Sequence, residues 1–192
     1  MRAAALALLL LIANPMVGHA ATASGPASTS YEVEVIVFEN RDQSLNGGEL
    51  WTRDRVKPIG VDLSQAVTVA DAPVDSALSA AAQRMKEDGR YRILLHKRWV
   101  QNPEAKSTSQ MVRLDDGVEL DGFLRFYLSR FLHVEVDLAL TKPTSGGLFS
   151  NDADINQLYR LTQQRRVKSQ EINYFDHPLF GALVRVTPTE QR

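Results

Sequence analysis

Short segments in which apolar and polar residues alternate dominate the sequence. In YEVEVIVF (31–38) Tyr and Val residues recur at every second position, and the same alternation runs through FLHVEVDLAL (131–140). Successive side chains of a strand point to opposite faces, so this period predicts strands of a sheet with a covered face. Three further segments are predicted as strands because of their apolar and β-branched content: 91–101, 122–128 and 182–188.

One stretch has helical spacing instead. Four apolar residues between Asp71 and Gly89 fall on one face of a helix: Leu78, Ala81, Ala82 and Met85. Pro73 suits a first helical turn, and Gly89 suits the position after a helix end. The sequence therefore predicts one α+β domain over residues 31–188, in which a largely antiparallel β-sheet carries one principal helix on one face.

Three other segments are less regular. Asp116-Gly117 lies between short extended arms and predicts a hairpin within residues 111–120. Residues 156–175 could form a helix or a long hairpin; their apolar residues hold no single helical stripe, so two exposed, twisted strands are favoured. Residues 39–60 predict a long loop.

The N-terminus has the pattern of a secretory signal peptide. An apolar run over residues 3–13 is followed by small residues at the two positions that a signal peptidase reads, Gly18 and Ala20. The run is short for a membrane span, so residues 1–20 are predicted to be a signal peptide, with an N-terminal membrane anchor as the alternative. Residues 21–30 are small and polar and predict a flexible leader. We therefore expect an exported chain with no later membrane span.

Composition limits what can stabilise the fold and what it can bind. The chain contains no Cys, so it forms no disulfide and carries no lipid on an N-terminal Cys. Its stability must therefore come from core packing. The formal net charge of −1 gives no bulk attraction to nucleic acid or to an anionic membrane, and neither is predicted as a partner.

An Asp next to a His, in YFDHPLFG (174–181), is the first candidate for catalysis. Nucleophilic catalysis needs a Ser or another nucleophile within hydrogen-bond reach, and no motif such as G-x-S-x-G marks one. A residue before Pro is held extended, and Asp caps turns through its side chain. We therefore interpret Asp176-His177 as part of a structural turn that leads into the last strand, with a catalytic pair as the alternative.

His133, Glu135 and Asp137 share one face of a predicted strand and form a candidate metal site. Neither H-x-x-x-H nor H-E-x-x-H spacing is present, so a polar sheet face is the favoured interpretation. No phosphate-binding loop and no well-placed pair of carboxylates for glycoside hydrolysis is evident. The sequence therefore predicts no metal, no cofactor and no enzymatic activity.

Arginine recurs next to aromatic residues on the predicted strands. Such neighbours occur at 91–92, 98–99, 125–127, 130–131 and 159–160. Aromatic faces can stack on sugar rings and guanidinium groups can pair with carboxylates, so the mixture suits a polymer of sugars and peptides. Core aromatics with solvated arginines would give the same pattern and are its more common origin.

Five stretches carry a family resemblance: YEVEVIVFEN (31–40), Leu50-Trp51, YRILLHKRWVQ (91–101), RFLHVEVDL (130–138) and YRLTQQRRVKSQEINYFDHPLFGALVRVTP (159–188). Together and in this order they resemble the CsiV-type family of peptidoglycan-binding proteins of the gammaproteobacterial periplasm. The resemblance implies a non-catalytic periplasmic protein that binds peptidoglycan. It also implies support of wall synthesis and cell shape, through a class A penicillin-binding protein and its outer-membrane lipoprotein activator.

Wall binding makes the recurring arginine and aromatic residues the candidate contacts. The predicted ligand-binding residues are Trp51, Arg98, Trp99, Arg125, Tyr127, Arg130 and His133. We expect the aromatic rings to stack on glycan and the arginines to pair with stem-peptide carboxylates. Two alternatives remain open: a module that contacts a wall synthase or its activator without binding the wall, and a wall hydrolase that uses His133 or His177.

Overall fold

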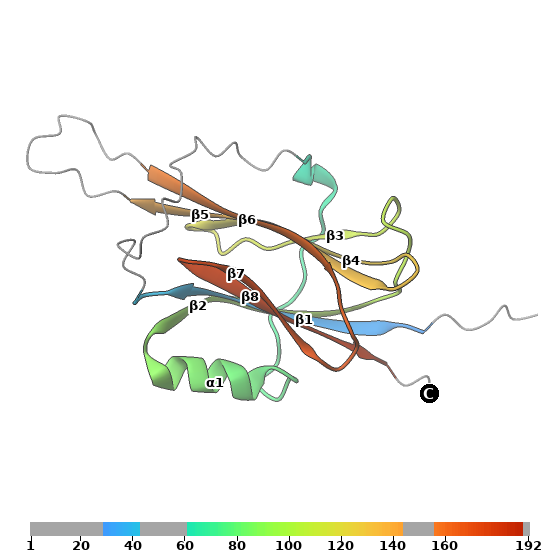
Figure 1. The fold of residues 1–192 in the computed structure, drawn as a ribbon, viewed down its shortest axis with the longest axis horizontal. Coiled ribbons are helices and arrows are strands. Elements are labelled where there is room, and N and C mark those ends of the chain that lie inside the picture. Colours follow the sequence, from blue (N-terminus) through green and yellow to red (C-terminus); the bar gives the residue numbers. More distant parts are fainter. Residues whose placement is uncertain (1–28, 43–60, 144–155, 190–192) are drawn as a thin grey trace, which may run out of the picture.

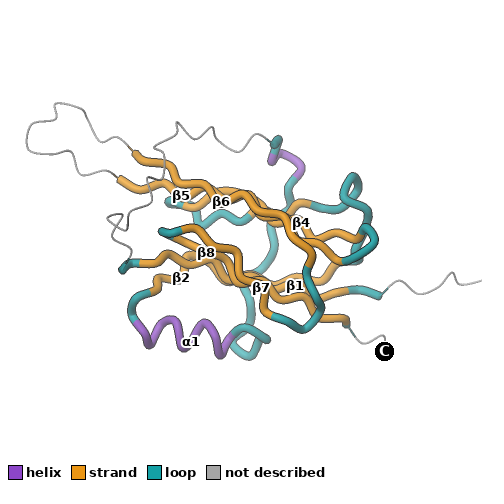
Figure 2. The backbone as a smooth tube through the Cα atoms, in the orientation of Figure 1, coloured by secondary structure: helices purple, strands orange, loops and turns teal. Residues whose placement is uncertain are grey.

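Two β-sheets packed face to face, with one helix outside them, form the fold (Figure 1). The computed structural model describes residues 29–42, 61–143 and 156–189. Sheet A has the order β2-β1-β8-β7 and consists of β1 (Tyr31–Asn40), β2 (Tyr91–Gln101), β7 (Ile172–His177) and β8 (Phe180–Pro188). Sheet B has the order β3-β4-β5-β6 and consists of β3 (Met111–Arg113), β4 (Leu120–Leu128), β5 (Leu132–Pro143) and β6 (Asn156–Arg166). One 3-10 turn, η1 (Leu63–Gln65), and one helix, α1 (Ser79–Asp88), complete the described elements (Figure 2).

The prediction of a single sheet is wrong, whereas the antiparallel pairing and the one principal helix are confirmed. All strand pairs within the two sheets are antiparallel. Alternation along a strand shows which face is covered but not what covers it. Here the apolar faces of two four-stranded sheets cover each other, as in a β-sandwich.

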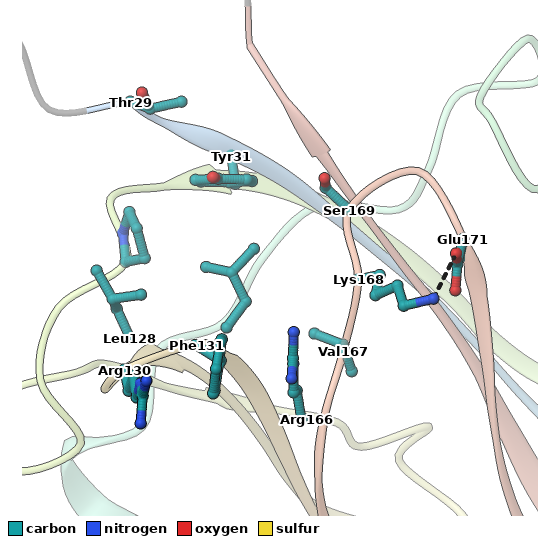
Figure 3. A pocket seen from close by; sticks show the side chains of 12 residues that line it. Thr29, Tyr31, Leu128, Arg130, Phe131, Arg166, Val167, Lys168, Ser169 and Glu171 are labelled. Carbon is teal, nitrogen blue, oxygen red and sulfur yellow. Dashed lines mark hydrogen bonds and ion pairs between the residues drawn. The ribbon is translucent and has the colours of Figure 1, made fainter.

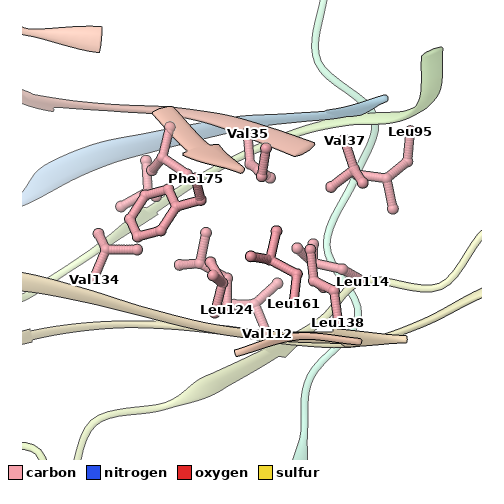
Figure 4. Packing of buried hydrophobic residues seen from close by; sticks show 14 of the residues in the cluster. Val35, Val37, Leu95, Val112, Leu114, Leu124, Val134, Leu138, Leu161 and Phe175 are labelled. Carbon is pink, nitrogen blue, oxygen red and sulfur yellow. The ribbon is translucent and has the colours of Figure 1, made fainter. Parts of the chain in front are cut away.

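The main core lies between the two sheets (Figure 4). Val33, Val35 and Val37 of β1 are fully buried in it, together with Leu124 and Leu138 from sheet B. These three valines are the alternate positions that the sequence pattern predicts to share one face. Their burial fixes the register of β1, because a slip by one residue would turn them away from the core.

A second, smaller core lies on the other face of sheet A, beneath α1. Ile36 and Phe38 of β1 pack there against Leu78 and Ala82. Strand β1 is therefore buried on both faces, which explains why its apolar residues continue through positions 36 and 38 rather than alternating strictly.

The helix begins at Ser79, not at Asp71 as predicted, and it is ended as predicted by Gly89, which follows Asp88 and has φ 73°. The preceding residues pair with β2 instead: the Ala72 amide donates to the His96 carbonyl oxygen at 2.9 Å, and Asp71 forms an antiparallel bridge with Lys97. These backbone bonds and Pro73 hold the segment outside helical geometry. The chain therefore closes the β2 edge of sheet A before it enters the helix.

Glu34 joins β1 to the start of α1 from a buried position. Its side chain is 1% exposed, and both carboxylate oxygens accept the Leu78 amide at 3.1 Å. Nε2 of His96 lies 2.6 Å from Oε1 of the same carboxylate. A buried carboxylate is tolerated here because an amide at the helix N-terminus and an imidazole both satisfy it.

The remaining sequence predictions have mixed outcomes. The two strands predicted within residues 156–175 are confirmed as β6 and β7. Asp116-Gly117 lies in a longer connection than a tight hairpin, in which Oδ1 of Asp116 accepts the amides of Glu119 and Leu120, both at 2.9 Å.

The predicted loop over residues 39–60 falls mostly outside the described residues, and its first two residues belong to β1. Within the described ranges, no helix is both long and apolar enough to span a bilayer.

Asp176-His177 forms the end of β7, and Pro178-Leu179 makes the turn to β8. Nδ1 of His177 accepts the Leu179 amide at 3.2 Å, and the imidazole packs 5.1 Å from the Phe180 ring centroid. The structural interpretation of this motif as a turn into the last strand is confirmed. Burial lowers the pKa of His177, and the neighbouring Asp176 charge offsets this only in part.

This depressed pKa predicts a pH-dependent step in stability. Unfolded His177 has a pKa near its ordinary 6.5, so as pH falls the unfolded chain takes up a proton before the folded chain does. The contribution of neutral His177 to the free energy of unfolding is therefore complete above the pKa of the unfolded chain. It is lost as pH falls through the lower pKa that His177 has in the folded chain. In His177→Asn an amide oxygen can still accept the Leu179 amide but does not titrate. We expect the melting temperature of the wild type to fall more than that of His177→Asn when pH is lowered from about 7.5 to about 5.5, and equal falls would contradict this.

Candidate binding groove

An open groove of about 710 Å³ lies at one end of the sandwich. It forms where the β4–β5 turn, the β6–β7 connection and the start of β1 come together (Figure 3). Tyr31 lines it from β1, Arg130 and Phe131 from the β4–β5 turn, and Arg166 and Lys168 from the end of β6 and beyond. The groove therefore depends on both sheets, because its walls come from sheet A and sheet B.

Local hydrogen bonds hold the two segments that form the groove. In the β4–β5 turn the Ser129 amide donates to the Phe131 carbonyl oxygen at 3.0 Å, a hydrogen bond within the turn itself rather than between the two strands. In the β6–β7 connection the Val167 amide donates to the Leu132 carbonyl oxygen at 2.9 Å. Val167 itself is buried in the main core. Both segments are thus anchored to sheet B, so the groove has a preformed floor.

Phe131 lies between two guanidinium groups (Figure 3). Cζ of Arg166 is 3.6 Å from the ring centroid, and Cζ of Arg130 is 5.5 Å from it. The ring itself belongs to a residue that is 38% exposed. Cation–π contacts of this kind contribute about 0.5–1 kcal/mol at exposed sites and orient the guanidinium planes.

Neither of these two arginines pairs with a carboxylate within the described part of the chain. The acidic residue of the groove, Glu171, pairs with Lys168 at 3.4 Å, and both side chains are largely solvent-exposed. The cation–π contacts with Phe131 do not use the N–H groups of the guanidiniums as hydrogen-bond donors to a carboxylate. The groove therefore presents two sets of hydrogen-bond donors with positive charge, which suits a carboxylate-bearing ligand.

The outer face of sheet B continues from the groove and contains three more predicted residues. His133 is the register partner of Arg166 on β6, and its ring stacks on Tyr127 at 5.1 Å with an interplanar angle of 12°. Tyr127 is only 3% exposed, so little of its ring can reach a ligand. Arg125 lies 3.4 Å from the Glu135 carboxylate. Glu135, on the predicted polar face of β5, therefore already has an ion-pair partner within the protein.

Arg98 and Trp99 lie on β2 of sheet A and point to opposite faces. Arg98 is the register partner of Glu34 on the helix side, and its guanidinium lies 3.3 Å from Glu32. Trp99 packs against the main core and donates through Nε1 to Oε1 of Gln101 at 2.6 Å. The structure therefore does not bring these two residues together at one surface. Trp51 lies outside the described residues.

Sequence reasoning selected Arg130 but missed Phe131, Arg166 and Lys168. Arg130-Phe131 was visible as an arginine next to an aromatic residue, so Phe131 could have been named with it. Arg166 comes near Phe131 only through the pairing of β5 with β6, in which His133 faces Arg166. Strand register of this kind is a tertiary property and leaves no signal in the local sequence.

A second pocket, of about 530 Å³, lies beside an ion-pair network that joins the two sheets. Arg92 of β2 contacts Glu39 of β1 at 2.7 Å, and Lys142 of β5 contacts Glu119 at 2.8 Å; the crossed pairs Arg92–Glu119 and Lys142–Glu39 are also formed. Burial acts to raise the pKa of Glu39, but Lys142 and Arg92 lower it overall. These charges are satisfied by one another, so this pocket is the weaker candidate for an anionic ligand.

A metal site is not apparent: in the ranges that the structure describes, no three His, Cys, Asp or Glu residues gather in a way that could hold an ion. The predicted metal candidates show other contacts. Nε of Arg160 donates to Oδ1 of Asp137 at 2.7 Å, and Nδ1 of His133 lies 2.8 Å from the Phe131 carbonyl oxygen.

The fold and the groove define a β-sandwich protein with a cationic groove suited to a carboxylate-bearing ligand. The family model described as "Peptidoglycan-binding protein, CsiV" matches residues 55–189, and the chain belongs to this family. No curated protein and no solved structure shows a significant match. The parts of the groove that come from sheet B and the β6–β7 connection all fall within the matched range.

Proposed function

We propose that this chain binds peptidoglycan non-covalently and that the groove formed by Arg130, Phe131 and Arg166 is its contact with the wall. The observation that carries the proposal is the pair of guanidinium groups on either side of one ring, without carboxylate partners among the described residues. Membership of a peptidoglycan-binding family supports the ligand class. The binding is proposed to be non-catalytic.

The family also supports a location at the cell wall. We propose that residues 1–20 direct export to the periplasm and that residues 21–30 form a leader before the domain. Bound to the wall, the chain would support wall synthesis and cell shape as an accessory to a class A penicillin-binding protein and its outer-membrane lipoprotein activator. This finer role rests on the family resemblance.

The test is retention of the chain from Ala21 to Arg192 on purified, protein-free sacculi across a salt series. We expect retention at low salt that declines as salt rises, because the screening length falls from about 10 Å at 0.1 M to about 3 Å at 1 M. Absence of retention at every salt concentration would contradict wall binding and favour a module that contacts a wall synthase. Release of soluble muropeptides from the sacculi would contradict the non-catalytic part of the proposal.

A further inference from the structure

We infer that the groove recognises the carboxylates of the stem peptides of peptidoglycan rather than its glycan chains. The inference rests on the proposed wall binding and adds the chemical part of the wall that is bound. The two parts differ sharply in charge, because the amino-sugar chains are uncharged whereas the peptides carry free carboxylates. A groove built for one part should therefore look different from a groove built for the other.

A glycan site would present a free aromatic face on which a sugar ring could stack. Among the described residues, the aromatic rings at this end of the sandwich already have side-chain partners. The Phe131 ring is flanked by the guanidiniums of Arg166 and Arg130. Tyr31 packs edge-on against Phe126 at 5.5 Å, and Tyr127 is almost fully buried beneath His133.

A peptide site would instead present fixed donors for carboxylates, and the groove has these. Both guanidiniums contact the same Phe131 ring, within 5.5 Å of its centroid, so a single short peptide can reach both. Each guanidinium offers parallel N–H groups that fit a carboxylate bidentately. Lys168 adds a third cation on the rim, and its exposed pairing with Glu171 is weak enough for a competing carboxylate to replace.

The ligand that fits this arrangement is an extended peptide with at least two free carboxylates close together. Its apolar side chains or backbone could lie along the groove wall formed by Leu128 and Leu132. The glycan would then serve as the polymer that displays the peptides, without contacts that determine affinity.

The test converts the carboxylates of purified sacculi to methylamides, which removes the negative charge of the peptides and leaves the glycan unchanged. Wild-type chain should be retained on untreated sacculi and at least about tenfold more weakly on amidated sacculi. The variant Arg130→Gln with Arg166→Gln, which has no charge at these two positions, should bind both preparations weakly and nearly equally. The matched control, Arg84→Gln with Lys86→Gln, removes the same charge from exposed positions on α1 and should behave as the wild type.

The outcomes separate the two proposals. Equal wild-type retention on untreated and amidated sacculi would overturn recognition of carboxylates and leave wall binding intact. An equally large drop for the wild type and for the Arg130→Gln, Arg166→Gln variant would show that carboxylates are bound outside the groove and would also overturn the inference. Absence of retention on untreated sacculi would overturn the proposed function itself.

Discussion

Gly122→Ala is expected to destabilise the fold by about 3 kcal/mol or more, enough to unfold a chain of ordinary stability in part. Gly122 has φ 155° on β4, a conformation that residues with a Cβ rarely adopt. A Cβ added there would lie 2.8 Å from Cα of Leu138 and still closer to the Asp137 carbonyl oxygen, both backbone atoms of β5. Backbone in the middle of a sheet cannot move aside as a flexible side chain can. Urea denaturation followed by circular dichroism measures the loss.

Gly117→Ala provides the matched control. Gly117 also has a positive φ, of 75°, but an added Cβ would meet nothing within 4 Å. Gly117→Ala should lower the free energy of unfolding only by the conformational strain at this position, about 1 kcal/mol. Equal destabilisation by the two variants would show that the close approach of β4 to β5 is not what requires glycine at position 122.

Local sequence patterns predicted those parts of the fold that depend on local contacts. Strand β2 was predicted with its observed bounds, 91–101, and β1 was recognised from the alternation of Val33, Val35 and Val37. The β7–β8 turn was recognised because Pro178 restricts the residue before it. In each case the sequence signal lies within a few residues along the chain.

Parts that depend on long-range packing could not be predicted in this way. The division into two sheets depends on which strands pair, and the shortened helix depends on the pairing of Ala72 with β2. Glu34 sits at a position that alternation assigns to a polar face, yet it is buried because α1 covers that face and supplies the Leu78 amide. A single sequence does not show which element will cover an outer face.

The same limit applies to the candidate site. Arg130 lies in the groove, but Tyr127 and Trp99, which were chosen for stacking on glycan, are largely covered by neighbouring side chains. Aromatic residues next to arginine do not reveal whether the ring or the charge will be accessible. Arg166, which completes the groove, lies at the end of β6, whereas Phe131 precedes β5. The two residues come together only because β5 pairs with β6.

Reversing both groove charges, in Arg130→Glu with Arg166→Glu, is expected to weaken binding to sacculi severely. Each arginine would lose a charge-assisted pair with the wall, and the new carboxylates would repel those of the stem peptides. A loss of about 1 kcal/mol for each pair, the upper end for exposed pairs, corresponds to an apparent Kd about 30-fold higher. The two side chains are exposed and have no ion-pair partner in the described part of the protein, so the fold should be retained.

The most direct test of the central claim, that the chain binds the wall through this groove, is the apparent Kd of three proteins for the same protein-free sacculi. They are the wild type, Arg130→Glu with Arg166→Glu, and a control with the same change in charge on α1, Arg84→Glu with Lys86→Glu. Circular dichroism would first establish that all three are folded. We expect the groove variant alone to lose binding while the control stays within about threefold of the wild type. Equal affinity of the groove variant and the wild type, or equal losses in both variants, would contradict the claim.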